Sequence, residues 1–224
     1  TGRGTMIITR EACKALQISL KGASVAIQGF GNVGSWTARL LAEQGAKIVA
    51  GSGVRGGIHC ERGIDIPALT EHFKATGSVC DMAWTRPLSN AELLTLKVDV
   101  LIPAALGAAI DQHNASQVQA KLVIEAANSP VTPQADEILR RAGVQVVPDI
   151  LVNAGGVTVS YFEWVQNLQQ IRWDEAHVNS ELEKKMLPAW QAVQRVATED
   201  KLPMRIAAYV VALKRLAEAT RQRY

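Results

Sequence analysis

The sequence has few of the features that mark disulfide-stabilised, metal-binding or membrane-spanning proteins. Its three cysteines, Cys13, Cys60 and Cys80, are an odd number and show no CxxC spacing. Disulfides and a zinc site are therefore not expected, and a reducing, cytoplasmic environment fits the pattern best. His59 precedes Cys60, but no second cluster of ligands accompanies this pair, so no metal is expected. No apolar run approaches the roughly 18 residues of a membrane span, and no signal-peptide pattern is present.

Aromatic residues are also scarce, at 5%, and the net charge is only +3. Basic residues concentrate in one predicted helix that also carries an apolar stripe, at Lys214, Arg215, Arg221 and Arg223. Because no aromatic residues interleave with these cations, a solvated helix face is favoured over a nucleic-acid surface. With 48% apolar and 20% charged residues, the 224-residue chain has the composition of an ordinary globular protein with a substantial core.

The clearest local pattern is a strand, a glycine turn, a helix and a second strand. Residues 24–28 form a short apolar run that stops at Gly29, as a buried parallel strand does. Apolar residues then recur at helical spacing until Gly45, which is a plausible helix terminator. A second apolar run follows at residues 46–50. This order predicts a βαβ unit.

The remainder of the first 152 residues continues the alternation of helices and strands. A helix is predicted at 65–74, a capping box at 89–92 opens a short helix, and a helix runs from Thr132 to Gly143. Further strands are predicted at 98–102, 121–125 and 144–147. The alternation predicts an α/β, Rossmann-like, doubly wound and mostly parallel sheet, with residues 1–152 as a dinucleotide-binding domain.

Residues 153–224 are expected to form a C-terminal helical segment that packs on this domain and lines its cleft. Two amphipathic stripes support this expectation, and Pro188 should kink the first of the two helices. The stripes are Val178, Leu182, Met186, Ala189, Val193 and Val196, and Ile206, Tyr209, Val210, Leu213, Leu216 and Ala217.

The glycine turn is the strongest functional signal. Gly29 permits a sharp turn, Gly31 lets a pyrophosphate approach the backbone, and Gly34 lets the helix pack closely on the strand. The start of the helix then offers free N–H groups and a partial positive charge. In its βαβ setting the turn predicts dinucleotide binding, although a structural tight turn is the alternative.

The loop expected after the second strand carries no carboxylate to bind the ribose 2′-hydroxyl of NAD. Residues 51–55 instead offer Ser52 and Arg55, which favour a 2′-phosphate. NADP or dual use is therefore expected over strict NAD use, unless Arg55 simply points to solvent.

Small and polar residues follow three further predicted strands, at the sheet edge where ligands bind in open α/β folds. Ala104 and Ala105 leave room for a ribose, and Asn128 offers both a donor and an acceptor. Asn153 is placed to cap the helix that follows it, and Ser160 lies two turns later on nearly the same face. The pair Gly155-Gly156 is costly at a helix start unless another group approaches the backbone closely. Ordinary turns and a capped structural helix are the alternatives for these segments.

Several of these segments together resemble the glutamate dehydrogenase family. The resemblance is carried by Thr1-Gly2-Arg3-Gly4, by residues 28–34, by Ile102-Pro103-Ala104-Ala105 and by the block 148–168. Leucine and phenylalanine dehydrogenases are similar in design, but residues 159–164 look like the glutamate branch. The resemblance implies NAD(P)-dependent, reversible oxidative deamination of L-glutamate to 2-oxoglutarate and ammonia, in a homo-oligomeric, hexameric enzyme.

The resemblance also assigns roles to individual residues. It implies that Ser160 binds the substrate side-chain carboxylate and that Asn128 lies near the nicotinamide ribose. The coenzyme contacts that it and the turn imply are Thr1, Gly29, Phe30, Gly31, Asn32, Val33, Gly34, Ala104, Ala105, Asn128 and Asn153, with Ser52 and Arg55 at the 2′ position.

One departure from the family limits the expected activity. The family's catalytic lysine and aspartate belong to an N-terminal substrate domain, and nothing in this sequence matches that segment. The chain is therefore expected to bind coenzyme without turning over glutamate, with its own N-terminal domain as partner. The coenzyme domain of another amino-acid dehydrogenase, or a non-catalytic nucleotide-sensing domain, are the competing hypotheses.

Overall fold

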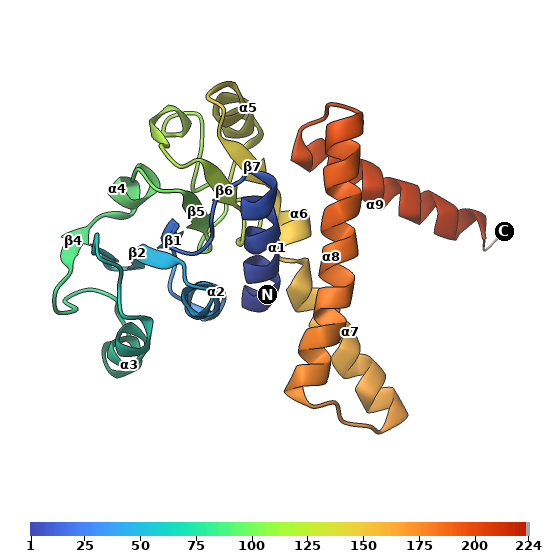
Figure 1. Cartoon of the computed structure of the whole chain (residues 1–224), viewed down its shortest axis with the longest axis horizontal. Coiled ribbons are helices and arrows are strands. Elements are labelled where there is room, and N and C mark those ends of the chain that lie inside the picture. The colour runs from blue at the N-terminus through green and yellow to red at the C-terminus, as the bar shows by residue number, and fades with distance from the viewer. Residues whose placement is uncertain (223–224) are drawn as a thin grey trace.

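A seven-stranded sheet lies at the centre of the structure, a computed structural model that describes residues 1–222 (Figure 1). Its strand order is β4-β3-β2-β1-β5-β6-β7, and the five strands from β2 to β7 in this order run parallel. β3 and β4 are antiparallel at one edge. The strands are β1 (Ser24–Gln28), β2 (Lys47–Gly53), β3 (Gly56–His59), β4 (Arg86–Leu88), β5 (Val100–Pro103), β6 (Leu122–Ile124) and β7 (Gln145–Val147). The predicted α/β class with a mostly parallel sheet is confirmed.

Helices cover both faces of this sheet (Figure 1). The apolar cores on the two faces separate cleanly: α4, α5 and the short η1 pack on one face, and α1, α2 and the later helices pack on the other. The helices are α1 (Gly2–Ala15), α2 (Asn32–Glu43), α3 (Ile66–Thr76), α4 (Asn90–Leu94), η1 (Ala115–Gln117), α5 (Pro133–Arg141), α6 (Asp149–Val152), α7 (Ala154–Gln169), α8 (Glu175–Glu199) and α9 (Met204–Arg221).

Local signals in the sequence set several of the element boundaries. Gly45 follows α2 with a φ of 86°, which suits the left-handed residue after a helix end. Ser89 forms the predicted capping box with Glu92 at the start of α4. Thr132 caps α5 through the backbone N–H of Ala135. These three predictions are confirmed.

Four elements depart from the sequence predictions. The first helix, α1, was assigned no structure from sequence, yet it is buried between α2, α7 and α8. The edge strands β3 and β4 were also missed, because β3 begins with two glycines and β4 contains a proline, residues that weaken strand patterns. The second strand does not end before Gly51 as predicted, because β3 pairs with it through Gly53.

The two C-terminal stripes have different environments. In α8, Leu182, Met186 and Val193 are buried, as predicted, and the helix continues through Pro188. In α9 the predicted stripe faces outward, since Leu213 and Leu216 are more than 60% exposed and the buried residues are Ala207 and Ala208. The start of α9 thus packs on the rest of the described chain, whereas the predicted stripe itself is exposed. Arg223, in the basic stretch, lies outside the described residues.

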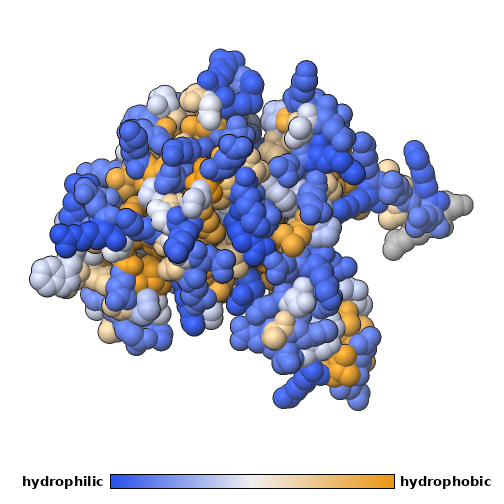
Figure 2. Space-filling model, viewed as in Figure 1, coloured by the Kyte–Doolittle hydropathy of each residue, from blue (hydrophilic) through white to orange (hydrophobic). Residues whose placement is uncertain are grey.

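Apolar side chains are also exposed on α7. Tyr161, Trp164 and Leu168 are each more than half exposed and recur at helical spacing. Figure 2 shows apolar surface over the outer part of this helix. Within residues 1–222, no helix is both long enough and apolar enough to cross a bilayer.

Candidate functional site

The candidate site lies where the strand order reverses. The chain leaves β1 for β2 on one side and later returns as β5 on the other side of β1. The carboxyl ends of β1 and β5 stay paired, but the connections after them lead to α2 on one face of the sheet and to η1 on the other. Ligands bind in the crevice that such a divergence leaves in open α/β sheets. The glycine turn begins at this point, directly after β1.

Gly29 and Gly34 are fixed by the packing of the turn. Gly29 has a φ of 95°, and a Cβ at this position would lie 2.9 Å from the Cβ of Ala105. A Cβ on Gly34 would lie 1.8 Å from the carbonyl oxygen of Gly29. Only glycine allows α2 to pack this closely on the turn, so the structural roles predicted for these two residues are confirmed.

Gly31 differs, because the protein itself gives no reason for a glycine there. No atom lies within 4 Å of the position that a Cβ would take, and its φ of −77° suits any residue. Gly31 precedes α2, whose start has no side-chain cap and no acidic residue in the first turn. The first N–H groups of the helix thus point at open space with a partial positive charge. This open cradle fits a pyrophosphate.

A cleft of about 830 Å³ extends from this turn. Five segments line it: Thr1 before α1, the start of α2, the loop after β5, the loop after β6 and the start of α7. Among these described lining residues, none has a charged side chain. They are Thr1, Val33, Ala104, Ala105, Leu106, Gly107, Ala126, Ala127, Asn128, Asn153, Gly156, Val157 and Ser160. The structure therefore brings together seven of the predicted site residues: Thr1, Val33, Ala104, Ala105, Asn128, Asn153 and Ser160. The others do not line this cleft: Gly29, Phe30, Gly31, Asn32, Gly34, Ser52 and Arg55.

Two asparagines join the β6 loop to α7 inside this cleft. The side-chain amide of Asn153 donates a hydrogen bond of 2.8 Å to the side-chain oxygen of Asn128. Asn153 holds the N-cap position of α7, but its side chain makes no cap hydrogen bond. The predicted capping role is therefore wrong: α6 runs into α7, and the near-helical φ and ψ of Asn153 differ from the extended geometry of a capping residue.

The glycine pair in α7 is explained by α1. A Cβ on Gly155 would lie 3.0 Å from the Cα of Gly4, and one on Gly156 would lie 2.3 Å from the hydroxyl of Thr1. The close approach expected at these glycines is thus made by another helix of the chain. This contact also holds Thr1 at the edge of the cleft.

Ser160 lies on the cleft side of α7, as the spacing from Asn153 predicted. It is exposed, and its hydroxyl donates to the backbone carbonyl of Gly156 at 3.2 Å. The hydroxyl can rotate toward a ligand, so a contact with substrate stays a prediction.

The two residues predicted to meet a 2′-phosphate lie apart. Ser52 is in β2, fully buried, and its hydroxyl donates to the side-chain oxygen of Asn90 at 2.7 Å. A phosphate contact would require that hydroxyl to leave Asn90. Arg55 is exposed in the β2–β3 turn, where its guanidinium donates to the carbonyl oxygen of Thr76 at 3.1 Å. Arg55 is thus tied to the end of α3 and still accessible.

Phe30 lies in the turn and Gln28 directly before it, and both are buried. Phe30 is buried and packs edge-on against Phe73, with 5.5 Å between ring centroids, so it offers a ligand only its backbone. The side-chain oxygen of Gln28 is buried without a hydrogen-bond partner, the one such side-chain atom among residues 1–222. Sequence reasoning had not singled out Gln28.

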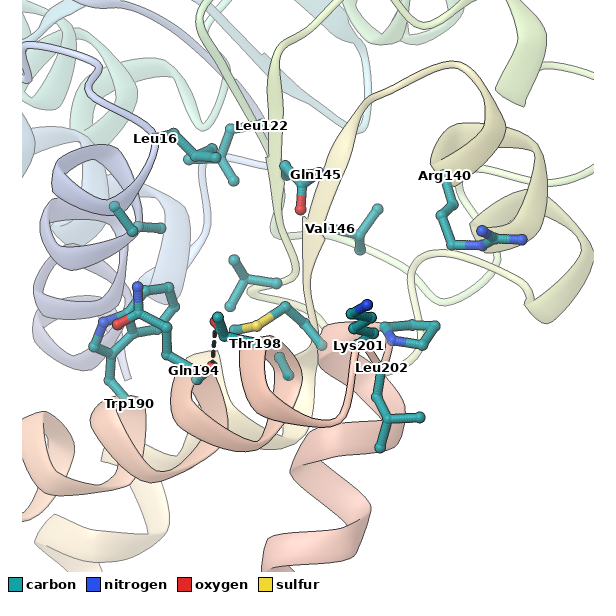
Figure 3. Close-up of a pocket in the computed structure, with 16 residues that line it drawn as sticks. Leu16, Leu122, Arg140, Gln145, Val146, Trp190, Gln194, Thr198, Lys201 and Leu202 are labelled. Carbon is teal, nitrogen blue, oxygen red and sulfur yellow. Dashed lines mark hydrogen bonds between the residues drawn. The ribbon is translucent and has the colours of Figure 1, made fainter.

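A second cavity, of about 400 Å³, lies between α1, β7, α8 and α9 (Figure 3). Leu122 and Gln145, which begin β6 and β7, line it, so it opens toward the amino ends of these strands, away from the turn. Its other lining side chains include Trp190, Gln194 and Lys201 (Figure 3). None of these side chains is a buried polar group left without a partner.

Sequence reasoning also missed the ionised groups behind the cleft. Glu125, directly after β6, is fully buried and pairs with Arg205 at the start of α9. Burial raises the pKa of Glu125, and the paired guanidinium opposes this effect. The pKa of Arg205 is raised because its carboxylate partners outweigh the effect of burial. No local signal marks this pair, since its members lie 80 residues apart.

The chain matches one family model along nearly its whole length. The model for the Glutamate/Leucine/Phenylalanine/Valine dehydrogenases matches residues 1–223. Among curated relatives, an NADP-specific glutamate dehydrogenase of Halobacterium salinarum is 50% identical over 98% of this chain. An NAD-specific glutamate dehydrogenase of Staphylococcus aureus is 44% identical over 100% of it.

The fold also matches solved structures of glutamate dehydrogenases. The hetero-hexameric glutamate dehydrogenase of Thermus thermophilus superposes with a TM-score of 0.93 at 35% identity, covering 100% of this chain and 53% of that one. The two curated relatives are covered over 53% and 54% of their own length. The chain therefore spans about half the length of the relatives it matches.

Proposed function

Because this chain belongs to the Glutamate/Leucine/Phenylalanine/Valine dehydrogenase family, we propose that it is the coenzyme-binding part of an NAD(P)-dependent glutamate dehydrogenase. The observation that carries this proposal is the open cradle at Gly31. Its neighbours Gly29 and Gly34 are glycines because the fold requires it, whereas the space beside Gly31, at the start of α2, is open to a ligand.

We assign the coenzyme contacts from this cradle outward. The backbone N–H groups of Asn32 and Val33 bind the pyrophosphate, where the helix dipole favours negative charge. Small side chains at Ala104 and Ala105 make room for the nicotinamide ribose. Asn128 and Asn153 present amide groups at that end, and Thr1 closes the same end from α1. The bound coenzyme supplies the hydride acceptor for oxidation of an amino acid.

The proposed reaction is reversible oxidative deamination of L-glutamate to 2-oxoglutarate and ammonia. Ser160, which lines the cleft, donates a hydrogen bond to the side-chain carboxylate of the substrate. The reaction also moves protons as an imine forms and is hydrolysed, which requires groups that ionise near neutral pH. Since no charged side chain lines the described cleft, those groups belong to a separate N-terminal substrate domain, and this chain binds coenzyme without turnover.

Coenzyme choice depends on the β2–β3 turn in this proposal. The relatives of this chain include both NADP-specific and NAD-specific enzymes, so family membership leaves the choice of coenzyme open. Residues 51–56 contain no carboxylate that would repel a 2′-phosphate, and Arg55 is exposed there. We therefore propose that NADP binds at least as tightly as NAD.

The exposed apolar stripes of α7 and α9 support assembly with further protein. Leu213 and Leu216 on α9, and Trp164 and Leu168 on α7, are each more than half exposed. Contiguous apolar surface of this kind is typical of interfaces. We propose that a substrate domain and neighbouring subunits cover these helices in a homo-oligomer. The relative from Thermus thermophilus is a hetero-hexamer and supports the number of six subunits, not their identity.

Titration of the chain with NADH and NADPH, followed by nicotinamide fluorescence, tests the proposed function. We expect binding below millimolar concentration in the wild-type chain. A graded series, Gly31→Ala and Gly31→Val, should weaken binding with side-chain size while the fold is kept, because the Cβ position is open. The loss of glycine at the N-cap of α2 should lower the melting temperature only slightly. Absence of binding at millimolar coenzyme would contradict the proposal.

A second assay tests whether the chain alone can oxidise glutamate. Glutamate with NAD or NADP should give no coenzyme reduction above background in the presence of the pure chain. Turnover would show that proton-transfer groups have been overlooked. If the coding sequence before Thr1 encoded no lysine-bearing, glycine-rich domain, a nucleotide-sensing role would be favoured instead.

A further inference from the structure

A cluster of buried charges connects the start of α9 to the edge of the cleft. The guanidinium of Arg205 makes two hydrogen bonds to the Glu125 carboxylate, of 2.7 and 3.0 Å. It makes a third, of 3.0 Å, to Asp136 in α5, and lies 3.7 Å from the carboxylate of Asp149. The Glu125 side chain is fully buried, and the others are at most 22% exposed. Three carboxylates thus share one guanidinium.

From this cluster, hydrogen bonds continue to the loop that lines the cleft. The second oxygen of Glu125 accepts a bond of 2.8 Å from the backbone N–H of Asp149. The Asp149 carboxylate in turn accepts a bond of 2.7 Å from the backbone N–H of Ser129. Ser129 adjoins Asn128, which lines the cleft and receives the amide of Asn153. The chain of contacts therefore runs from α9 to the cleft in three links.

The last link holds a backbone that serine adopts reluctantly. Ser129 has a φ of 46°, in the left-handed region that disfavours residues with a Cβ. A charged acceptor on its N–H offsets that cost, since hydrogen bonds to ionised groups are the stronger ones. Arg205 is the cation of the described cluster that faces both Glu125 and Asp149, and its positive charge reduces the repulsion between these two carboxylates.

We propose that Arg205 is a positioning residue for the coenzyme: acting through Glu125 and Asp149, it sets the turn that presents Asn128 to the nicotinamide ribose. This proposal rests on the proposed function, which places the ribose at Asn128 and the pyrophosphate at Gly31. The pyrophosphate cradle belongs to β1 and α2, and no hydrogen bond of the cluster reaches it. Loss of Arg205 should thus weaken binding at one end of the coenzyme only.

Arg205→Lys is the informative variant, because lysine keeps one charge but cannot hold Glu125 by two bonds and Asp136 by a third. The matched control is Arg140→Lys, since Arg140 makes a similar forked contact with Glu137 on the exposed surface of α5. The 224-residue chain is titrated with NADH and, separately, with ADP, which carries the pyrophosphate but lacks the nicotinamide ribose. All titrations are made well below the melting temperature of each variant.

We expect Arg205→Lys to weaken NADH binding about tenfold, the effect of losing about one hydrogen bond, with less than a twofold change for ADP. Arg140→Lys should change neither. Unaltered NADH affinity in a folded Arg205→Lys protein, or equal losses for NADH and ADP, would overturn the proposal. If Arg205→Lys does not fold, Asp149→Asn replaces it with the same expected selectivity. A wild-type chain that binds neither NADH nor ADP contradicts the proposed function itself. If the wild-type chain binds both and Arg205→Lys does not lose NADH affinity selectively, only the role proposed for Arg205 is contradicted.

Discussion

Replacing Gly34 with alanine sets two physical effects against each other. Gly34 is the third residue of α2, and helix propensity alone favours alanine there by about 0.5–1 kcal/mol. The added Cβ, however, would lie 1.8 Å from the carbonyl oxygen of Gly29. Because Cβ atoms essentially never come within 3.0 Å of such atoms, α2 and the turn must separate by about 1.2 Å.

This separation disturbs the buried junction between α2 and β1. Overpacking of a well-packed core costs about 1–3 kcal/mol, and the neighbour here is backbone, which cannot rotate away. We therefore expect Gly34→Ala to lower the free energy of unfolding by about 1–3 kcal/mol. For a protein of this size that corresponds to a melting temperature lower by roughly 2–12 °C.

Gly31→Ala is the matched control, since it adds the same methyl group three residues earlier, where nothing lies within 4 Å. Because Gly31 is the N-cap residue of α2 and glycine is preferred over alanine there, the control should cost no more than about 1 kcal/mol, less than Gly34→Ala. Thermal denaturation followed by circular dichroism measures both variants. A Gly34→Ala protein that melts at or above the wild-type temperature would show that the turn and α2 are not packed as described.

Three further perturbations address substrate, coenzyme choice and acid stability. In an enzyme containing both domains, Ser160→Ala should raise KM for glutamate and lower kcat/KM about tenfold or more, because a hydrogen bond to the substrate carboxylate is lost. A loss of coenzyme affinity with unchanged glutamate kinetics would contradict the assignment of Ser160. The wild-type chain should prefer NADP by a factor on the order of ten, and this preference should weaken with salt because the site is exposed. Arg55→Asp should reverse the preference. Titrations in which NAD is preferred both before and after the change would reject this role of Arg55. Hydrogen bonds from Lys121 and Ser24 outweigh burial and hold the pKa of Asp99 below its ordinary value of 3.8. The ionised carboxylate thus stabilises the fold above that pH and loses its contribution as the pH falls through the lowered pKa. In urea melts, the difference in stability between wild type and Asp99→Asn should therefore be present at pH 7 and vanish in strong acid. A difference that does not depend on pH would argue against this role of Asp99.

Where a structure depends on neighbours in the sequence, the sequence alone determined it. The strand that stops at Gly29, the glycine spacing and the helix that ends before Gly45 together specified a βαβ unit, because each signal acts over a few residues. The same spacing correctly placed Asn153 and Ser160 on one side of a helix, and the structure shows that this side lines the cleft. The glycine pair at 155–156 indicated a close approach, although it did not identify the approaching segment.

Only the tertiary structure decided which groups meet across long separations. Asn153 binds Asn128 rather than capping its own helix, and Ser52 gives its hydroxyl to Asn90, because these partners come from other elements of the sheet. Arg205 meets Glu125 from 80 residues away. Propensity and periodicity describe how a segment folds on itself, but such pairs are selected by burial, which leaves a polar group only the partners that packing brings within reach.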